Sequence, residues 1–201
     1  MLFLVLVGIS LAISFERRRL TENEPDMVNF NRHMIYRGCY IFGLGVILTI
    51  ISFIILPGYP IYFGILQLIG VSIIISIVLI RLKSVYLFYV SMFLILLGNI
   101  ITHISAINDN IFQYILGFHT NIRSVDYFPL VYWLSFVVFG IAIGKLLYQD
   151  NKRQFSLLNL CSFTKFKAFS WLAKHSLLIY LLHQPIIIGV LLLIKHFIVK
   201  V

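Results

Sequence analysis

Residues 39–80 read CYIFGLGVILTIISFIILPGYPIYFGILQLIGVSIIISIVLI, with no charged side chain among them. Two apolar runs, residues 39–56 and 61–80, flank the tetrapeptide PGYP at residues 57–60. Proline fixes φ and lacks a backbone donor, and glycine tolerates positive φ, so the tetrapeptide predicts a tight turn. Each run approaches the roughly 20 apolar residues that cross about 30 Å of hydrocarbon at 1.5 Å per residue. The stretch therefore predicts a helical hairpin inside a lipid bilayer.

The rest of the chain is similarly apolar. Of its 201 residues, 61% are hydrophobic and 11% are charged, and the mean hydropathy is +1.00. A soluble domain carries roughly 25% charged residues and about 45–50% apolar ones. The composition therefore excludes a cytosolic enzyme, a secreted disulfide scaffold, a disordered tail and a nucleic-acid-binding domain, because all of these need more polar surface. The two cysteines, Cys39 and Cys161, give no disulfide framework, and we expect both to be free thiols.

Six apolar runs predict an all-α, polytopic membrane helix bundle that forms one transmembrane domain over residues 1–201. Residues 1–15 are expected to be a short span, because positive charge follows this apolar run and no small-residue cleavage site marks it as a secretory signal. Residues 155–174 mix aromatic residues with lysines and are predicted to lie in the headgroup layer, with a disordered cytoplasmic linker as the alternative. The predicted spans are residues 1–15, 39–56, 61–80, 85–101, 128–147 and 177–199.

Lysine and arginine concentrate in alternate loops. The turn at residues 57–60 has none, and the loop from residue 102 to residue 125 has only Arg123. The positive-inside rule then predicts that the first, third and fifth loops are cytoplasmic and that both termini lie outside. We expect a multi-pass integral protein of the cell membrane, and a preceding helix that is missing would explain the outside N-terminus. The basic residues of the cytoplasmic loops are Arg17, Arg18, Arg19, Arg32, Arg37, Arg81, Lys83, Lys152, Arg153, Lys165, Lys167 and Lys174.

Polar residues within the predicted spans are costly in hydrocarbon, so they are the first candidates for function. Gln67 lies between Gly64 and Gly70, where small residues let another helix approach and the amide can hydrogen-bond across helices. A tie between helices is the alternative to a catalytic role for this residue. His183 lies shortly before Pro185 in the last span. Its neutral imidazole can act as a general base, a hydrogen-bond donor or an acyl acceptor, and a packing residue is the alternative.

The longest predicted external loop holds, with its flanks, several titratable side chains. A histidine beside a carboxylate can abstract a proton, because the acid orients the ring and stabilises the imidazolium. His103 and Asp126 are therefore candidate catalytic residues, and a solvated outer rim is the alternative. No HxxxH or CxxC spacing and no glycine-rich phosphate loop occurs, so no metal site is predicted. The titratable residues of this region are His103, Asp109, His119, Arg123 and Asp126.

Two cations lie at the predicted cytoplasmic ends of spans. They are Arg37 and Lys145, and Lys152 and Arg153 follow a little further into the adjoining loop. Arginine and lysine are the usual partners of phosphate, so these cations suit a phosphorylated carrier that arrives from the cytosol. The positive-inside topology alone is the alternative explanation for their position.

Several segments follow one another in a definite order. They are LVLVGISL at residues 4–11, Arg37-Gly38, FGILQLIG at residues 63–70, DYFPL at residues 126–130 leading to FGIAIGKLLY at residues 139–148, and HSLLIYLLHQP at residues 175–185. This order resembles the prokaryotic branch of the heparan-alpha-glucosaminide N-acetyltransferase catalytic-domain family. The resemblance covers nearly the whole chain.

Members of that family are polytopic transmembrane acyltransferases, which take acetyl from cytosolic acetyl-CoA and deliver it at the opposite face to an acceptor, an amino sugar in the best-known branch. The resemblance implies a membrane-bound acyltransferase whose donor, acetyl-CoA or another acyl-CoA, binds near Arg37 and Lys145. The acyl group would lie along the polar residues within the spans and meet the acceptor near His103 and Asp126. The implied partners are acyl-CoA, a glycan or other small acceptor, and membrane lipids, with a homo-oligomer left open.

The sequence departs from the family pattern at its start. Family members usually begin with a further helix that carries an Asp, an Arg-Gly pair and the histidine usually proposed for acyl transfer. We therefore carry that histidine over to no position here, and we expect either a truncated sequence or a member without the usual catalytic apparatus. The other functions considered are a small-solute transporter and a lipid-binding helix bundle. The lack of internal repeats or symmetrically interrupted helices weighs against a transporter.

Overall fold

The computed structural model describes residues 1–19, 24–55, 58, 60–104, 110–118, 124, 126–149, 152–153 and 179. The chain divides into two compact units, Met1–Phe155 and Ser156–Val201, and Ile179 is the described residue of the second unit. The predicted headgroup segment 155–174, the predicted span 177–199 apart from Ile179, and His183 therefore lie outside the described residues. The named helices and strands all belong to the first unit.

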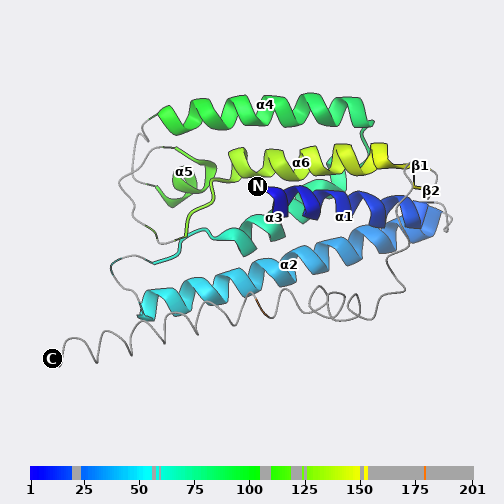
Figure 1. The fold of residues 1–201 in the computed structure, drawn as a ribbon. Helices are drawn as coiled ribbons and strands as arrows, with labels where there is room; N and C mark the ends of the chain where they lie inside the picture. The colour runs from blue at the N-terminus through cyan, green and yellow to red at the C-terminus, as the bar shows by residue number, and fades with distance from the viewer. Residues whose placement is uncertain are drawn as a thin grey trace, which may run out of the picture. The chain divides into compact units, whose positions relative to one another are not determined.

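The described part of the first unit is a helix bundle, which confirms the predicted all-α class (Figure 1). Its two strands are only two residues long each, and they pair antiparallel with Tyr148 opposite Arg153. The elements are α1 (Leu2–Arg19), α2 (Glu24–Ile55), α3 (Ile65–Leu79), α4 (Ser84–His103), α5 (Ile111–Leu116), α6 (Leu130–Leu147), β1 (Tyr148–Gln149) and β2 (Lys152–Arg153).

Three of the described helices are long and apolar enough to cross a membrane, namely Val28–Ile55, Ser84–His103 and Leu130–Leu147. Helix α3 is a shorter apolar helix of 15 residues. Helix α2 begins at Glu24 and not at residue 39, because hydropathy reports where hydrocarbon begins, whereas polar residues with adequate helix propensity continue the helix beyond it. These helices indicate an integral membrane protein, and the count of six spans stays a prediction.

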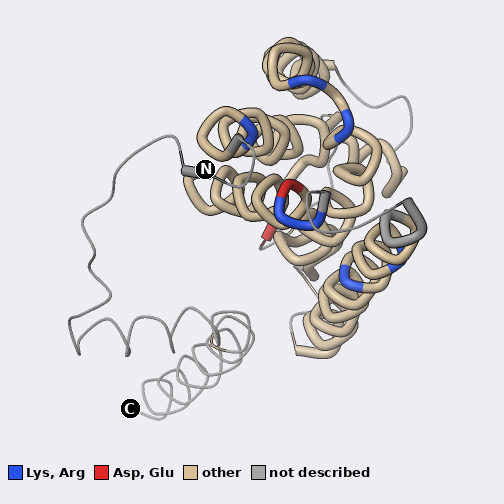
Figure 2. Tube along the Cα trace, turned by 90° about the vertical axis from the view of Figure 1, so that its right-hand side faces the viewer, with Lys and Arg blue, Asp and Glu red and all other residues tan. Residues whose placement is uncertain are grey.

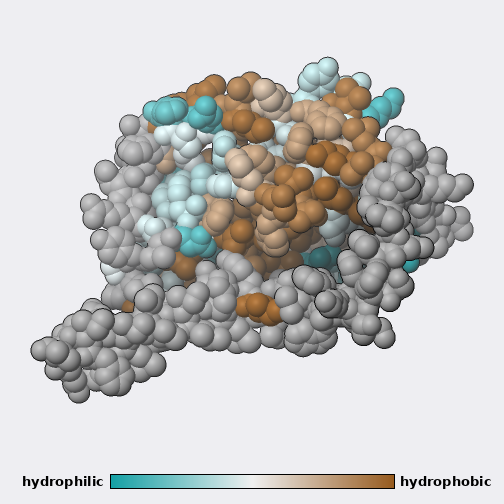
Figure 3. Space-filling view, in the orientation of Figure 1, coloured by the Kyte–Doolittle hydropathy of each residue, from teal (hydrophilic) through white to brown (hydrophobic). Residues whose placement is uncertain are grey.

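The exposed side chains of α4 agree with lipid as their solvent. Tyr89 is 71% exposed, Phe93 is 62% exposed and Ile100 is 58% exposed. Figure 3 shows apolar side chains along α4, at the top of the view, between hydrophilic ones at its two ends. A contiguous apolar surface of this kind marks a face that is covered by hydrocarbon or by another apolar surface.

Helices α1 and α6 approach each other through small residues spaced four apart on each helix. A Cβ added to Gly140 of α6 would overlap the Val5 carbonyl of α1, and one added to Gly8 of α1 would overlap the α6 backbone. A Cβ added to Gly144 would lie 2.7 Å from the Cβ of Ala12. Small residues at this spacing let two membrane helices pack backbone to backbone. Glycine is therefore a steric requirement at this interface.

Glycines also allow close packing between α2 and α3 and between α4 and α6. In the hairpin of α2 and α3, a Cβ added to Gly70 would lie 2.8 Å from the Gly38 carbonyl oxygen. Between α4 and α6, a Cβ added to Gly98 would lie 2.8 Å from the Cα of Tyr132. Helix α4 is also tied to α6 by Ser84, whose Oγ donates to the Ala142 carbonyl at 2.8 Å. The close approach of α2 to α3 agrees with the predicted hairpin.

The helices alternate in direction, so the C-terminal ends of α1, α3 and α6 lie with the N-terminal ends of α2 and α4 (Figure 1). Lysine and arginine gather there in the end-on view of Figure 2, and we call it the basic end. The opposite end, made by residues 60–64, 110–118 and 126–129, is called the Asp126 end. The basic end includes the described side chains of Arg17, Arg18, Arg32, Arg37, Arg81, Lys83 and Lys145. The structure thus separates the two groups of candidate site residues along the helices.

Candidate functional site

Gln67 lies in the first turn of α3 and is 5% exposed. Its Oε1 accepts a hydrogen bond from the Gly64 backbone N–H at 2.9 Å, and its Nε2 donates to Thr49 Oγ1 of α2 at 3.0 Å. The Thr49 hydroxyl in turn donates to the Gly45 carbonyl at 3.2 Å. The Gln67 amide therefore both caps α3 and ties α3 to α2, which is the structural role named as the alternative for this residue.

The turn that joins α2 to α3 is closed by a second hydroxyl. Ser52 Oγ donates to the Thr49 carbonyl at 2.7 Å and accepts from the Ile61 backbone N–H at 2.9 Å. Ser52 is 6% exposed, so these hydrogen bonds satisfy polar groups that lipid could not satisfy. The last turns of α2 and the start of α3 thus form one hydrogen-bonded unit, and the Asp126 end is built on it.

Asp126 caps the N-terminus of α3 from a distant part of the chain. Its carboxylate accepts a hydrogen bond from the Ile65 backbone N–H, and its Oδ2 lies 2.9 Å from the position of a Cβ added to Gly64. Gly64 is the N-cap residue of α3 and has no side chain that could do this. Phe63 pairs with Tyr127 in an isolated parallel bridge, and the Phe128 N–H donates to the Phe63 carbonyl at 3.3 Å. This pairing brings the carboxylate to the helix end.

Two opposing effects act on the pKa of Asp126. Burial raises this pKa, and the Ile65 hydrogen bond to the charged form lowers it by less, so the pKa lies above the ordinary value of 3.8. The positive end of the α3 dipole also favours the carboxylate. A carboxylate with a raised pKa is a stronger base than an exposed aspartate, which is a property that proton abstraction needs.

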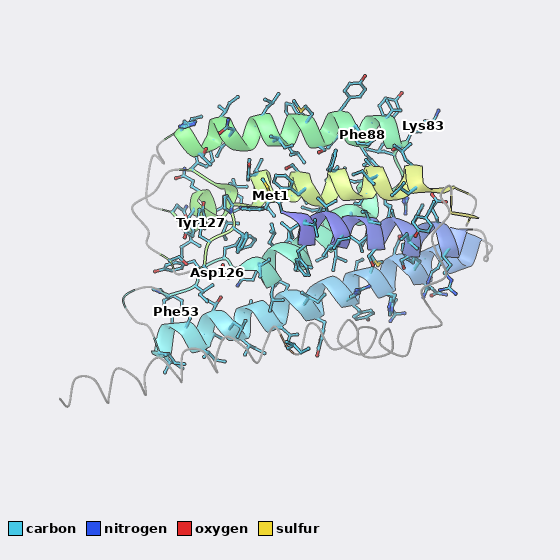
Figure 4. The ribbon with its side chains drawn as sticks, in the orientation of Figure 1. Met1, Phe53, Lys83, Phe88, Asp126 and Tyr127 are labelled. Atoms are coloured by element: carbon cyan, nitrogen blue, oxygen red, sulfur yellow. The ribbon has the colours of Figure 1, made fainter. Side chains whose placement is uncertain are left out.

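Two tyrosines fix the loop that carries Asp126. The Tyr127 hydroxyl donates to the Tyr114 carbonyl at 2.6 Å, and the two rings stack with centroids 4.1 Å apart. Ser124 Oγ donates to the Asp126 carbonyl at 2.9 Å. Burial raises the pKa of Tyr127 to about 12, so this hydroxyl stays a hydrogen-bond donor at physiological pH. Figure 4 shows Tyr127, Asp126 and Phe53 at the same end of the bundle.

Helix α5 presents Tyr114 to this cluster and is not among the predicted elements. Asn110 is its N-cap, with Oδ1 accepting from the Phe112 N–H at 3.2 Å, and Gly117 ends it in the left-handed region with a φ of 116°. Asparagine before and glycine after a short apolar segment are known helix boundaries. The sequence therefore contained the boundaries of α5, but it did not indicate that Tyr114 stacks on Tyr127.

His103 ends α4 and is exposed, at the Asp126 end of the bundle. The effects on the pKa of Asp126 are burial and the Ile65 hydrogen bond, and no histidine contributes. Among the described residues, the structure thus does not bring His103 and Asp126 into contact. Their pairing as a base and its orienting acid stays a prediction, and His183 lies outside the described residues.

Lys145 links three elements at the basic end. Its Nζ donates to the Leu82 carbonyl at 2.8 Å and lies 5.7 Å from the centroid of the Phe15 ring. Phe15 in turn packs against Phe30, with centroids 5.8 Å apart. The last turn of α6 is therefore fastened to α1 and to the loop between α3 and α4. Arg37, by contrast, is exposed on α2.

In the part of the chain that the structure describes, no group of three or more His, Cys, Asp or Glu residues is arranged to hold a metal ion. The described residues thus provide a half-buried carboxylate and tyrosines at one end, cations at the other, and a buried amide in the first turn of α3. Acid–base chemistry at the Asp126 end and anion binding at the basic end are what these groups can support.

Comparison with known families agrees with this arrangement. A family model described as the catalytic region of heparan-alpha-glucosaminide N-acetyltransferase matches residues 1–185, which include all the described helices. No curated protein and no solved structure gives a significant match to the chain. The family implies a membrane acyltransferase-like function. Since the match spans most of the 201 residues, the chain belongs to the heparan-alpha-glucosaminide N-acetyltransferase catalytic family.

Proposed function

We propose that the chain transfers an acetyl or acyl group from cytosolic acetyl-CoA to an acceptor, an amino sugar or another glycan, at the outer face of the membrane. The observation that carries the proposal is the family match over residues 1–185. In the reaction with an amine, the thioester C–S bond breaks and a C–N bond forms. The coenzyme A sulfur leaves as the thiol and the acceptor nitrogen loses a proton, so the step is balanced without an oxidant or reductant.

The donor would bind at the basic end. Arg37 is exposed there, and its guanidinium can hold phosphate oxygens of coenzyme A in a bidentate manner. The Lys145 ammonium lies at the same end, where its Nζ donates to the Leu82 carbonyl at 2.8 Å, and its positive charge favours a phosphate nearby. The gathering of lysine and arginine at this end supports a cytosolic donor, because positive charge is typical of cytoplasmic loops.

The acceptor would bind at the Asp126 end. An amino group becomes nucleophilic only after it loses its extra proton, and Asp126 is the base to which we assign that proton. Its raised pKa makes it a better base, while the Ile65 N–H keeps its oxygens fixed. His103 is exposed at the same end and is the second catalytic residue that we propose there.

Acyl transfer also needs donors for the oxyanion of the tetrahedral intermediate. Gln67 follows Gly64 by less than one helical turn, and Asp126 touches that same turn. One of its amide hydrogens is directed to Thr49, and the second is the donor that we assign to the oxyanion. His183, outside the described residues, is the proposed relay for the acyl group within the membrane.

The experiment is acetyl transfer by the purified full chain in lipid nanodiscs. Labelled acetyl-CoA and glucosamine are supplied, and both acetylated sugar and free coenzyme A thiol are measured. We expect Asp126→Asn to lower turnover by at least tenfold, in the range that loss of a general base produces. Asp109→Asn is the matched control, since it removes the same charge from the same predicted external loop and should leave turnover close to wild type. Absence of both coenzyme A binding and acetyl transfer in the wild-type chain would reject the proposal.

A further inference from the structure

The exposed face of α2 changes in character along its length. Near the basic end it is cationic and then aromatic, and further along it is aliphatic. Arg32 and His33 are exposed, Tyr36 is 61% exposed and Tyr40 is 66% exposed. The aliphatic part consists of Ile47, Ile50 and Ile54, of which Ile54 is 77% exposed.

These side chains lie on one side of the helix. Successive residues are about 100° apart around an α-helix, so Arg32, Tyr36 and Tyr40 fall within a sector about 80° wide. The buried residues Phe30 and Met34, each 2% exposed, lie on the opposite side. Along the helix, the outward face therefore carries guanidinium, then phenol and then isoleucine side chains.

Arg32 and Tyr36 place their polar tips together. The Arg32 Nη2 donates to the Tyr36 hydroxyl over 3.4 Å, and the guanidinium carbon lies 5.6 Å from the centroid of the ring. A guanidinium has five N–H donors, so most of them remain for an anion, and the Tyr36 hydroxyl adds one more at the same level. Two donors of this kind side by side fit a phosphate oxygen.

Helix α2 is longer than the hydrocarbon core is thick, so Arg32 and Tyr36 can lie at the level of the lipid headgroups. At 1.5 Å per residue its 32 residues span about 48 Å, more than the roughly 30 Å of the hydrocarbon core. If Ile47–Ile54 lies in hydrocarbon, Tyr36 and Tyr40 fall at the interface where tyrosine is enriched, and Arg32 lies about 12 Å beyond Tyr40 along the axis. This order of groups matches that of a phospholipid read from phosphate to acyl chain.

The charge of this face calls for an anionic partner. The sequence has no aspartate or glutamate between Asp26 and Asp109, so no acidic residue of α2 beyond its first turn neutralises Arg32. Arg37 lies about 140° around the helix from Arg32 and about 60° from Tyr40, so it borders the face and is not on the side that carries Arg32.

We infer that the outward face of α2 from Arg32 to Ile54 binds an anionic glycerophospholipid. The lipid phosphate contacts the Arg32 guanidinium and the Tyr36 hydroxyl, His33 lies beside it, and an acyl chain runs along Ile47, Ile50 and Ile54. The inference does not depend on the acyltransferase activity.

The test is native mass spectrometry of the full chain released from detergent after titration with phosphatidylglycerol or with phosphatidylcholine of the same acyl chains. The wild type should bind phosphatidylglycerol in preference to phosphatidylcholine. Arg32→Gln should weaken the affinity for phosphatidylglycerol about fivefold, the change that corresponds to about 1 kcal/mol for one basic residue near a membrane surface. Tyr36→Phe should weaken it by a smaller factor, because only the hydroxyl is lost.

The matched control is Arg81→Gln, which removes the same charge from an exposed position at the same end of the bundle. It should change the affinity less than twofold, and thermal unfolding in phosphatidylcholine micelles should confirm that all variants stay folded. Equal losses in Arg32→Gln and Arg81→Gln would overturn the inference in favour of a general surface potential. Equal competition by millimolar inorganic phosphate would point to a free-phosphate site, and loss of a dimer in Arg32→Gln would point to a second copy of this chain, so either result would also overturn it.

Discussion

Gly140 gives the sharpest test of how the bundle is held together. In a helix interior, replacing glycine by alanine stabilises by about 1 kcal/mol, because alanine loses less backbone entropy. At Gly140 the new Cβ would lie 2.9 Å from the Val5 carbonyl carbon and 3.0 Å from the Val5 Cα, and closer still to the carbonyl oxygen. Ordinary contacts between carbon atoms are about 3.5–4.0 Å, so α1 would have to move away by roughly 0.6 Å or more. The contacted atoms are backbone atoms, which cannot rotate out of the way.

We therefore expect Gly140→Ala to lower the free energy of unfolding relative to a glycine that has open space around it. Gly43 of α2 is that control, because a Cβ added there meets no atom within 4 Å. Both variants share the gain in helix propensity, so the difference between them isolates the steric cost, which is about 1–3 kcal/mol for an overpacked site. The measurement is reversible unfolding of the detergent-solubilised chain by dodecyl sulfate, followed by circular dichroism. Should Gly140→Ala prove as stable as Gly43→Ala, the close approach of α1 and α6 would be wrong.

Three further predictions concern the two ends. Tyr127→Phe removes the hydroxyl that donates to the Tyr114 carbonyl and should cost about 0.5–1.5 kcal/mol in the same unfolding assay, whereas Tyr89→Phe, on the exposed face of α4, should cost almost nothing. Because the pKa of Asp126 is raised in the folded state, ionisation of this residue opposes folding. The free energy of unfolding of the wild type, relative to that of Asp126→Asn, should therefore fall as pH rises above 3.8. It should level off once the carboxyl is ionised in the folded state as well. If this relative stability rose with pH instead, the burial of Asp126 would be contradicted. Lys145→Met should lower the free energy of unfolding by about 1 kcal/mol through loss of the Leu82 hydrogen bond, and Lys83→Met, which is exposed in the same region, serves as its control; equal stabilities would show that Lys145 does not fasten α6.

The sequence was informative about helices whose bounds follow from the length of an apolar run. Apolar runs predicted α3, α4 and α6 to within a few residues, because each run must be long enough to cover hydrocarbon and ends where polar residues or turn residues begin. It was less informative for α2, since charged residues before Arg37 continue the helix at no cost in water. The two hypotheses for Gln67 were both open in the sequence, and only its contacts with Gly64 and Thr49 favour the tie between helices.

The sequence by itself determined that the chain is an apolar helix bundle with positive charge in alternate loops, because hydropathy and charge act locally and need no knowledge of partners. Only the tertiary structure decided that Asp126 caps α3, that Tyr114 and Tyr127 hold its loop, and that α1 packs on α6 backbone to backbone. These contacts join residues far apart in the chain, and each depends on how closely two helices can approach. That distance is fixed by small residues on both partners at once, so it cannot be read from either segment alone.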